Sequence, residues 1–222
     1  MGAASQPLYD AEHLARKGAV VVSMNYRLGP FGFLSHPALS KESPENVSGN
    51  YGLLDQIAAL QWVKRNVAAF GGDPDRVTIF GESAGGGSVL TLLVSPLARG
   101  LFHRAVAQSS HEMTLPHLKR EFAGRIPAER QGEKIVARCG VSPGADAAEL
   151  RRIPAMKLLA ASPVLEVVGK EATLANLNLP VSPVVDGRVI LENPNDAFAA
   201  GRFHQVPFLV GGTRDEFSLF LV

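Results

Sequence analysis

The sequence predicts an α/β fold with a mostly parallel sheet flanked by helices. Apolar runs of strand length alternate with stretches whose apolar residues recur at helical spacing, which is typical of this class. One such run, at 77–80, leads through a serine between glycines directly into a helical stretch. The 222 residues are 46% hydrophobic, which is ample for a core. Because domains usually hold ~100–200 residues, we expect a single domain over 1–222.

The first strand is expected at 18–25, where the run Gly-Ala-Val-Val-Val-Ser-Met-Asn is apolar and rich in β-branched residues. Such runs are typical of parallel strands buried on both faces. The segment 26–33 reads as a turn containing glycine and proline, and the polar segment 36–50 is expected to be a surface loop.

A helix is expected at 51–70. Its apolar residues recur at helical spacing and its end carries a Gly-Gly pair and an Asp-Pro pair, namely Leu53, Ile57, Leu60 and Val67, then Gly71-Gly72 and Asp73-Pro74. The next strand, at 77–80, runs into the serine turn.

The serine turn is Gly81-Glu82-Ser83-Ala84-Gly85, which fits the pattern G-x-S-x-G. A sharp strand-to-helix turn lifts the serine hydroxyl clear of the sheet, where it can act as a nucleophile. Glycines two residues to either side let the strand and helix backbones pass without a Cβ clash. The helix N-terminus adds N–H groups, and that of Ala84 is placed to stabilise a developing oxyanion. The pattern therefore predicts nucleophilic catalysis by Ser83.

Two further strands are expected beyond the serine helix, at 102–108 and 206–211. The section between them, 110–180, has more charge, six prolines and patches of helical spacing. We expect it to be a helical and loop insertion in the same domain rather than a second domain.

Composition excludes several function classes. The formal net charge is +1, so nothing indicates a nucleic-acid partner. No apolar run approaches the ~18 residues of a membrane span. Cys139 is the only cysteine, which excludes an internal disulfide framework and a cysteine-based zinc site. No signal peptide is visible at the N-terminus, which favours a cytoplasmic location, with a leader in an upstream segment left open.

Five segments together are similar to a known family. They are Asn-Tyr-Arg-Leu-Gly-Pro-Phe-Gly-Phe at 25–33, Gly-Asn-Tyr-Gly-Leu-Leu-Asp-Gln at 49–56, Phe-Gly-Gly-Asp-Pro at 70–74, Phe-Gly-Glu-Ser-Ala-Gly-Gly at 80–86, and Gln-Ser at 108–109. They resemble the type-B carboxylesterases, the cholinesterase-like branch of the α/β-hydrolase fold. The resemblance covers most of 8–110 and returns at 184–216. It implies hydrolysis of small-molecule carboxylic esters by a Ser–Glu–His triad, with no cofactor and no metal.

The resemblance also assigns roles to individual residues. Ser83 corresponds to the nucleophile and the N–H of Ala84 to one oxyanion donor. Glu216 stands where the family has its triad acid, and Phe217 where it usually has glycine. Ser109 corresponds to a hydrogen-bonding residue near the acid. The carboxylate of Glu82 is expected to be structural, because a side chain one residue away along a turn points elsewhere.

Two parts of the family's catalytic machinery are absent from the sequence. The triad order in this fold is serine, acid, histidine. All six histidines precede Glu216, namely His13, His36, His103, His111, His117 and His204. His204 precedes the last strand and is expected about 23 Å away, at the opposite edge of the sheet. His111 follows the strand at 104–108 on the correct edge and is the only candidate for a substitute base. No glycine-rich oxyanion loop such as His-Gly-Gly-Gly is present.

We therefore expect the central part of a longer esterase, truncated at both ends. In this fold the strand before the oxyanion loop lies between those resembling 19–25 and 77–80, so two strand edges are expected to lack a partner. Three hypotheses follow: a serine carboxylic ester hydrolase, an inert fragment or cholinesterase-like interaction domain, or a segment that complements separately made flanking pieces. The sequence predicts neither the particular ester nor the oligomeric state.

Overall fold

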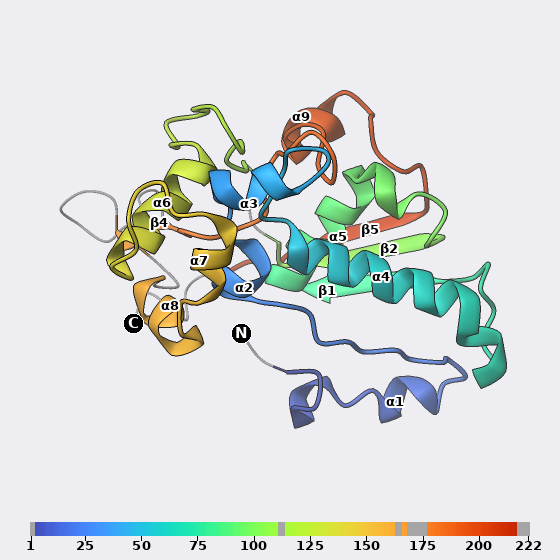
Figure 1. The fold of residues 1–222 in the computed structure, drawn as a ribbon. Coiled ribbons are helices and arrows are strands. Elements are labelled where there is room, and N and C mark those ends of the chain that lie inside the picture. Colours follow the sequence, from blue (N-terminus) through green and yellow to red (C-terminus); the bar gives the residue numbers. More distant parts are fainter. Residues whose placement is uncertain (1–2, 111–113, 163–165, 168–176, 217–222) are drawn as a thin grey trace. The chain divides into compact units, whose positions relative to one another are not determined.

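The structure is a computed structural model that describes residues 3–110, 114–162, 166–167 and 177–216 (Figure 1). The chain divides into two compact units. Unit 1 comprises Met1–Asn25, Leu54–Thr114 and Ile190–Val222, and unit 2 comprises Tyr26–Leu53 and Leu115–Val189.

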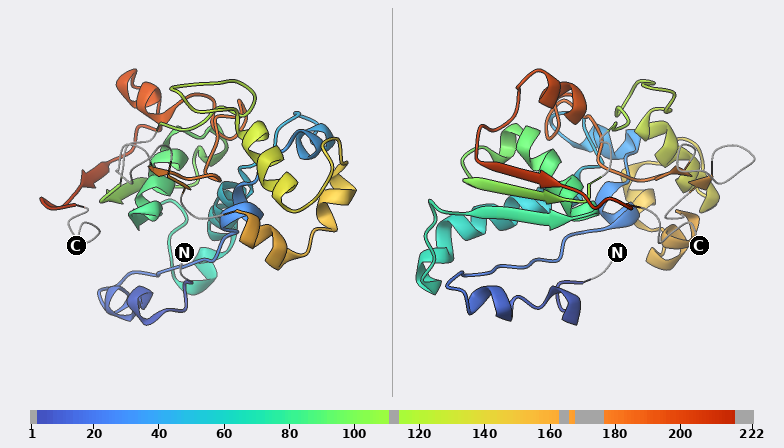
Figure 2. Two further views of the ribbon diagram at one scale, coloured as in Figure 1. Left: turned by 90° about the vertical axis from the view of Figure 1, so that its left-hand side faces the viewer. Right: turned by 180° about the vertical axis from the view of Figure 1, so that it is seen from behind.

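Unit 1 contains a three-stranded parallel sheet, seen from behind in the right-hand view of Figure 2. Its strands are β1 (Thr78–Glu82), β2 (Arg104–Gln108) and β5 (Phe208–Gly211), in the order β1-β2-β5. The register pairs Phe80 with Val106, and Val106 with Leu209. The strands expected at 77–80, 102–108 and 206–211 are thus confirmed, with slightly different ends.

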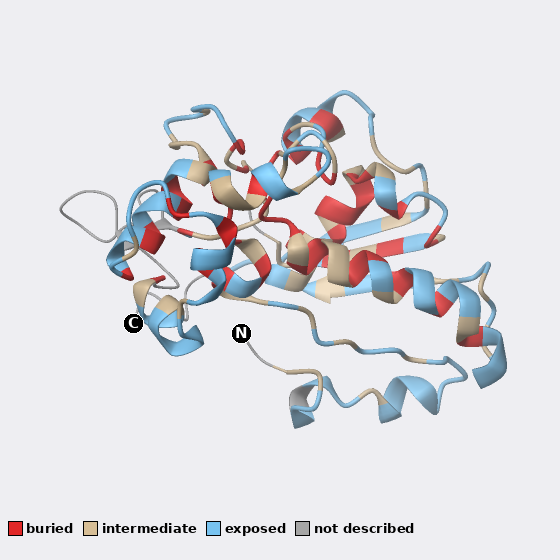
Figure 3. Cartoon of the chain, viewed as in Figure 1, coloured by how far each residue is buried: buried red, intermediate tan, exposed pale blue. Residues whose placement is uncertain are grey.

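Helix α5 (Ala84–Val94) packs against β1 and β2 and supplies much of the core of unit 1. Its buried residues, red in Figure 3, include Val89, Leu92 and the fully buried Leu93. The other helical elements that lie wholly in unit 1 are short: η1 (Pro7–Tyr9), α1 (Glu12–Ala15), η2 (Val67–Phe70), η3 (Pro96–Ala98) and α9 (Pro194–Ala199).

The helix expected at 51–70 is confirmed as α4 (Tyr51–Asn66), which continues into η2. Gly71 ends it in the left-handed conformation, at φ 80°. A side chain with a Cβ is disfavoured there, so the glycine acts as a helix terminator, as the sequence predicted.

The strand expected at 18–25 is wrong. Gly18 belongs to a turn, and 19–25 run alongside β1 in Figure 1, yet they form no strand in the described part of the chain. Val20 and Val22 are 44% and 43% exposed, and Phe80 on β1 is 55% exposed. Apolar β-branched residues form a buried strand only when neighbouring strands satisfy their backbone groups. Among the described strands β1 pairs with β2 alone, which agrees with the expected unpaired edge.

Unit 2 is mostly helical. Its elements are α2 (Gly29–Phe33), α3 (Pro37–Glu42), α6 (Ala128–Arg138), α7 (Ala147–Arg151), α8 (Ala155–Ala161) and an antiparallel pair, β3 (Glu166–Val167) with β4 (Leu177–Asn178). The turn expected at 26–33 includes the short helix α2, in which Pro30 lies near the start, where proline needs no N–H partner.

The surface loop expected at 36–50 is also wrong. It contains α3, and two of its serines, Ser40 and Ser48, are buried, although 41, 42 and 44–46 are exposed. The hydroxyls of Ser40 and Ser48 lie 2.7 Å apart. The amide of Asn50, 2% exposed, donates to the carbonyl of Val184 and to Asp186, and accepts from the N–H of Val184. These bonds satisfy polar groups that would otherwise be costly to bury.

The imidazole of His36 caps helix α3. Its Nδ1 accepts a hydrogen bond from the N–H of Ala38 at 3.1 Å, and the residue is 7% exposed. Burial lowers the pKa of His36, and this outweighs the nearby carboxylates of Glu133 and Glu129, which raise it. The folded state therefore favours the neutral ring, whose Nδ1 is free to accept.

We expect unit 2 to lose stability in mild acid through His36. Because the folded pKa is depressed, the contribution is complete above about pH 6.5 and declines as the pH falls below that value towards the folded pKa. An asparagine caps a helix without titrating, so the variant His36→Asn should show a flatter profile between pH 7.5 and 5.5. Urea unfolding followed by circular dichroism measures both profiles. Parallel profiles for the two proteins would contradict this role.

Cys139 is a free, buried thiol, 2% exposed. Among the described helices, none is both long and apolar enough to cross a membrane.

Candidate active site

Ser83 lies at the junction between β1 and α5. Its backbone is at φ 54° and ψ −116°, in a region that residues other than glycine rarely adopt. Its N–H donates to the carbonyl of Gln108 at 2.9 Å, and its own carbonyl accepts from Gly87 at 2.9 Å. These two bonds hold the turn from both sides. A backbone conformation of this kind costs about 1–3 kcal/mol and is typical of functional sites. The side chain of Ser83 is exposed.

The two glycines of the turn differ in how much room their surroundings leave for a Cβ atom. A Cβ on Gly81 would lie 2.4 Å from the carbonyl carbon of Gly85, so the backbones of strand and helix touch at this point. A Cβ on Gly85 would meet nothing within 4 Å. The predicted steric need for two glycines is therefore confirmed for Gly81 and is wrong for Gly85, whose backbone rather than its missing Cβ makes the contact.

Gly86 carries a steric requirement that the sequence pattern did not indicate. A Cβ there would lie 2.8 Å from the carbonyl oxygen of Gln108, so α5 lies close against β2. The signal for it was the third glycine in the run 85–87, since consecutive glycines are unfavourable in a helix.

Two linked hydrogen bonds support the first turn of α5. The amide of Gln56 on α4 donates to the hydroxyl of Ser88 at 3.1 Å, and that hydroxyl donates to the carbonyl of Ala84 at 3.1 Å. Gln56 is 3% exposed. Sequence reasoning missed this residue, although a glutamine beside the apolar stripe of α4 was a possible signal.

The N–H of Ala84 is the first of helix α5, and within the described part of the chain no acceptor is recorded for it. The first N–H groups of a helix have no acceptor inside the helix, and they carry the positive end of its dipole. The group is therefore available to an oxygen bound beside Ser83.

Glu216 follows β5 and is held by donors of Thr213 and Ser109. The N–H of Thr213 donates to its Oε1 at 2.5 Å, and the hydroxyl of Ser109 donates to the same carboxylate. These bonds, the backbone one foremost, lower the pKa of Glu216, so the carboxylate stays charged. Ser109 is itself in the left-handed region at φ 48°, and its N–H donates to the carbonyl of Gly211 at 2.7 Å.

The four predicted site residues lie at one end of the sheet. Ser83 and Ala84 follow β1, Ser109 follows β2 and Glu216 follows β5, and the strands are parallel, so these residues share the carboxyl edge. β1 and β5 are separated by two strand spacings, about 10 Å, with β2 between them. Glu82 ends β1 with its side chain exposed.

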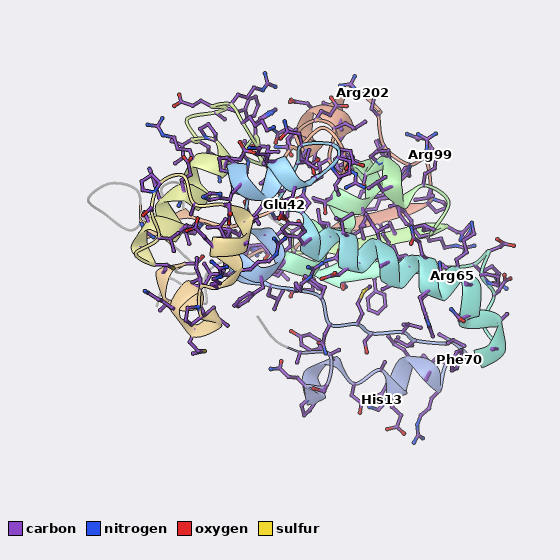
Figure 4. The ribbon with its side chains drawn as sticks, viewed as in Figure 1. His13, Glu42, Arg65, Phe70, Arg99 and Arg202 are labelled. Carbon is purple, nitrogen blue, oxygen red and sulfur yellow. The ribbon has the colours of Figure 1, made fainter. Side chains whose placement is uncertain are left out.

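The described histidines of unit 1 lie elsewhere. His103 precedes β2, and its Nδ1 accepts from the N–H of Val77 at 3.2 Å. His204 precedes β5, at the opposite edge as predicted, and its Nε2 lies 2.7 Å from the carbonyl of Ser95. His13 lies on the exposed helix α1 (Figure 4). His111, the candidate substitute base, and Phe217 lie outside the described residues.

Two other histidines belong to unit 2. His36 caps α3, and Nδ1 of His117 accepts from Nε of Arg120 at 3.1 Å. Among the described residues, no three His, Cys, Asp or Glu side chains are grouped so as to hold a metal ion.

Comparison with known proteins decides the family. The model of the carboxylesterase family matches residues 1–222. The chain belongs to the carboxylesterase family. The α/β-hydrolase fold and the type-B carboxylesterase resemblance expected from the motifs are thereby confirmed.

Named relatives of this carboxylesterase-family chain are esterases. It is 45% identical over 219 residues to fumonisin B1 esterase of Sphingopyxis macrogoltabida and 43% identical over 221 residues to para-nitrobenzyl esterase of Bacillus subtilis. It covers 37% and 42% of their lengths, and these alignments take in 99% of the chain. A solved structure of a PNB esterase superposes over the whole chain with a TM-score of 0.82 at 39% identity, and the chain covers 44% of that structure.

Proposed function

We propose that this chain carries the nucleophile and the triad acid of a serine carboxylic ester hydrolase. The observation that carries the proposal is the exposed Ser83, held at positive φ at the carboxyl edge of the sheet that also bears the Ser109–Glu216 pair. A binding domain has no use for a strained, exposed serine beside a helix N-terminus.

In the proposed reaction, Oγ of Ser83 attacks the acyl carbon of a small-molecule ester while a base takes its proton. The N–H of Ala84 donates to the oxyanion that forms. Collapse of the tetrahedral intermediate releases the alcohol, which leaves with the proton, and an acyl-serine remains. Water activated by the same base then releases the carboxylic acid. Glu216 orients the base and stabilises its charged form, and Ser109 and Thr213 keep Glu216 ionised.

A second candidate is that these 222 residues are inert when alone. The histidines described in unit 1 are not at the carboxyl edge, and a serine without a base stays protonated near pH 7 and attacks weakly. Under this alternative the chain is a fragment or an interaction domain of esterase descent. Hydrolysis of a short activated ester by the chain, with and without separately made flanking pieces, distinguishes inertness from complementation.

The role of Glu216 is tested in a chimera. Residues 1–222 replace the matching span of the Bacillus subtilis para-nitrobenzyl esterase, so that its remaining parts supply the base. We expect Glu216→Gln to lower kcat/KM for a short activated ester by about 10³–10⁴-fold, because the base loses its orienting charge.

Glu82→Gln provides the matched control, since this carboxylate adjoins Ser83 in sequence and is exposed. It should change kcat/KM less than about threefold. Full activity of the Glu216→Gln chimera, or a large loss on Glu82→Gln alone, would show that the acid has been assigned to the wrong residue.

A further inference from the structure

A pocket of about 400 Å³ lies in unit 1, at the end of the sheet opposite Ser83. Its lining residues are Arg99, Gly100, Phe102, Phe203, His204, Gln205 and Val206. They all precede β2 or β5, whereas the proposed catalytic residues follow the strands. The pocket is open to solvent, and its lining is about as polar as it is apolar.

The parallel pairing of β2 with β5 explains why the pocket forms. The N–H of Ala105 donates to the carbonyl of Pro207 at 3.1 Å, so the two segments that enter these strands arrive side by side. Gly100, at φ 70°, turns the chain between η3 and β2, and Arg99 is thereby left at the rim.

Two aromatic rings of the pocket lining are held in place before any ligand arrives. Phe102 is 4% exposed, and its ring meets that of His204 edge-on at 5.8 Å between centroids. The Nε2 of His204 lies 2.7 Å from the carbonyl of Ser95, which holds this ring in place. Phe203 packs on Phe198 with centroids 4.9 Å apart. A flat apolar group would therefore contact Phe203 without moving these rings.

The cation at the rim is available. Arg99 is exposed, and its guanidinium has no hydrogen bond or ion pair to any residue in the described part of the chain. Arg202, labelled with Arg99 in Figure 4, is instead bound to the carboxylate of Glu192 through two bonds of 2.7 and 2.6 Å. Among the residues recorded in the lining, none is acidic. An anion would meet the guanidinium of Arg99 without a competing carboxylate in the lining.

From this arrangement we propose that the pocket binds a small aromatic carboxylate. The planar guanidinium of Arg99 takes the carboxylate through paired N–H donors, and the half-buried Phe203 contacts the ring. The site is separate from the proposed catalytic end of the sheet and does not depend on the proposed ester hydrolysis.

Benzoate is the probe, titrated into the 222-residue chain by calorimetry or ligand-observed NMR. We expect saturable binding in the millimolar range or tighter, and about tenfold or more weaker binding after Arg99→Gln. Arg99→Lys should retain part of the affinity, because the charge remains but the fork is lost. Benzyl alcohol, of similar shape but neutral, should bind at least about tenfold more weakly than benzoate.

Arg65→Gln is the matched control. Arg65 is an exposed arginine on α4 in the same unit, and its guanidinium bonds to no other described residue, so its loss should leave benzoate binding unchanged. Absence of saturable binding by the wild-type chain, or equal affinity of the Arg99→Gln and Arg65→Gln variants, overturns the proposal. If Arg99→Gln alters the circular dichroism spectrum, the comparison of the two ligands on the unmodified chain becomes the test. Equal affinity of that chain for benzoate and benzyl alcohol would then overturn the proposal.

Discussion

Replacing Ser83 by alanine in the esterase chimera is expected to lower kcat by about 10⁴–10⁶-fold. The proposed reaction passes through an acyl-serine, and alanine has no oxygen to form it. Alanine at φ 54° is about as strained as serine, so the turn should keep its conformation. Hydrolysis of a short activated ester measures the loss, and mass spectrometry detects the acyl-enzyme in the parent chimera only.

Ser5→Ala is a suitable control, since this serine is exposed near the N-terminus, away from the serine turn in sequence. It should leave kcat unchanged, and circular dichroism should report folded protein for both variants. Turnover in the Ser83→Ala chimera close to that of the parent would rule out Ser83 as the nucleophile. A similar comparison in the 222-residue chain alone is expected to show equal background rates, because no described histidine of unit 1 lies at the carboxyl edge.

Gly81→Ala is expected to destabilise unit 1 by about 2–4 kcal/mol. The new Cβ would lie 2.4 Å and 2.5 Å from the carbonyl carbon and oxygen of Gly85, and both are backbone atoms that move only if the strand and the helix separate. Urea unfolding followed by the fluorescence of Trp62, the single tryptophan and a residue of unit 1, measures the change.

Gly85→Ala is the matched control, because its Cβ meets no atom within 4 Å and its backbone φ is not positive. It should be neutral or stabilising by up to about 1 kcal/mol, since alanine loses less backbone entropy than glycine in a helix. Equal destabilisation by the two substitutions would refute the steric explanation for the serine turn.

Local features of this protein were readable in the sequence. The end of α4 at Gly71 and the serine turn depend on backbone geometry over a few residues, and their glycines leave a direct signal in the residue order. The strands at 77–80 and 104–108 carried the same kind of local signal.

Burial and pairing depended on contacts between distant segments. The apolar run at 18–25 has the composition of a strand, but a strand forms only with neighbours, and none pairs with it among the described residues. The polar residues Ser48 and Asn50 suggested a surface loop, because composition does not reveal whether a polar group bonds to water or to a buried partner such as Val184.

The sites combine both kinds of information. Ser83 was identifiable from its own turn, and Glu216 was assigned by resemblance. The bond from Ser109 to Glu216 joins residues that are far apart in the chain, and it exists because β2 and β5 are adjacent and parallel. The same adjacency places Phe102 beside His204 at the other end of these strands. At both ends of these strands, hydrogen-bonding groups and rings meet because distant segments pack together. The local periodicity of the sequence does not reveal such contacts.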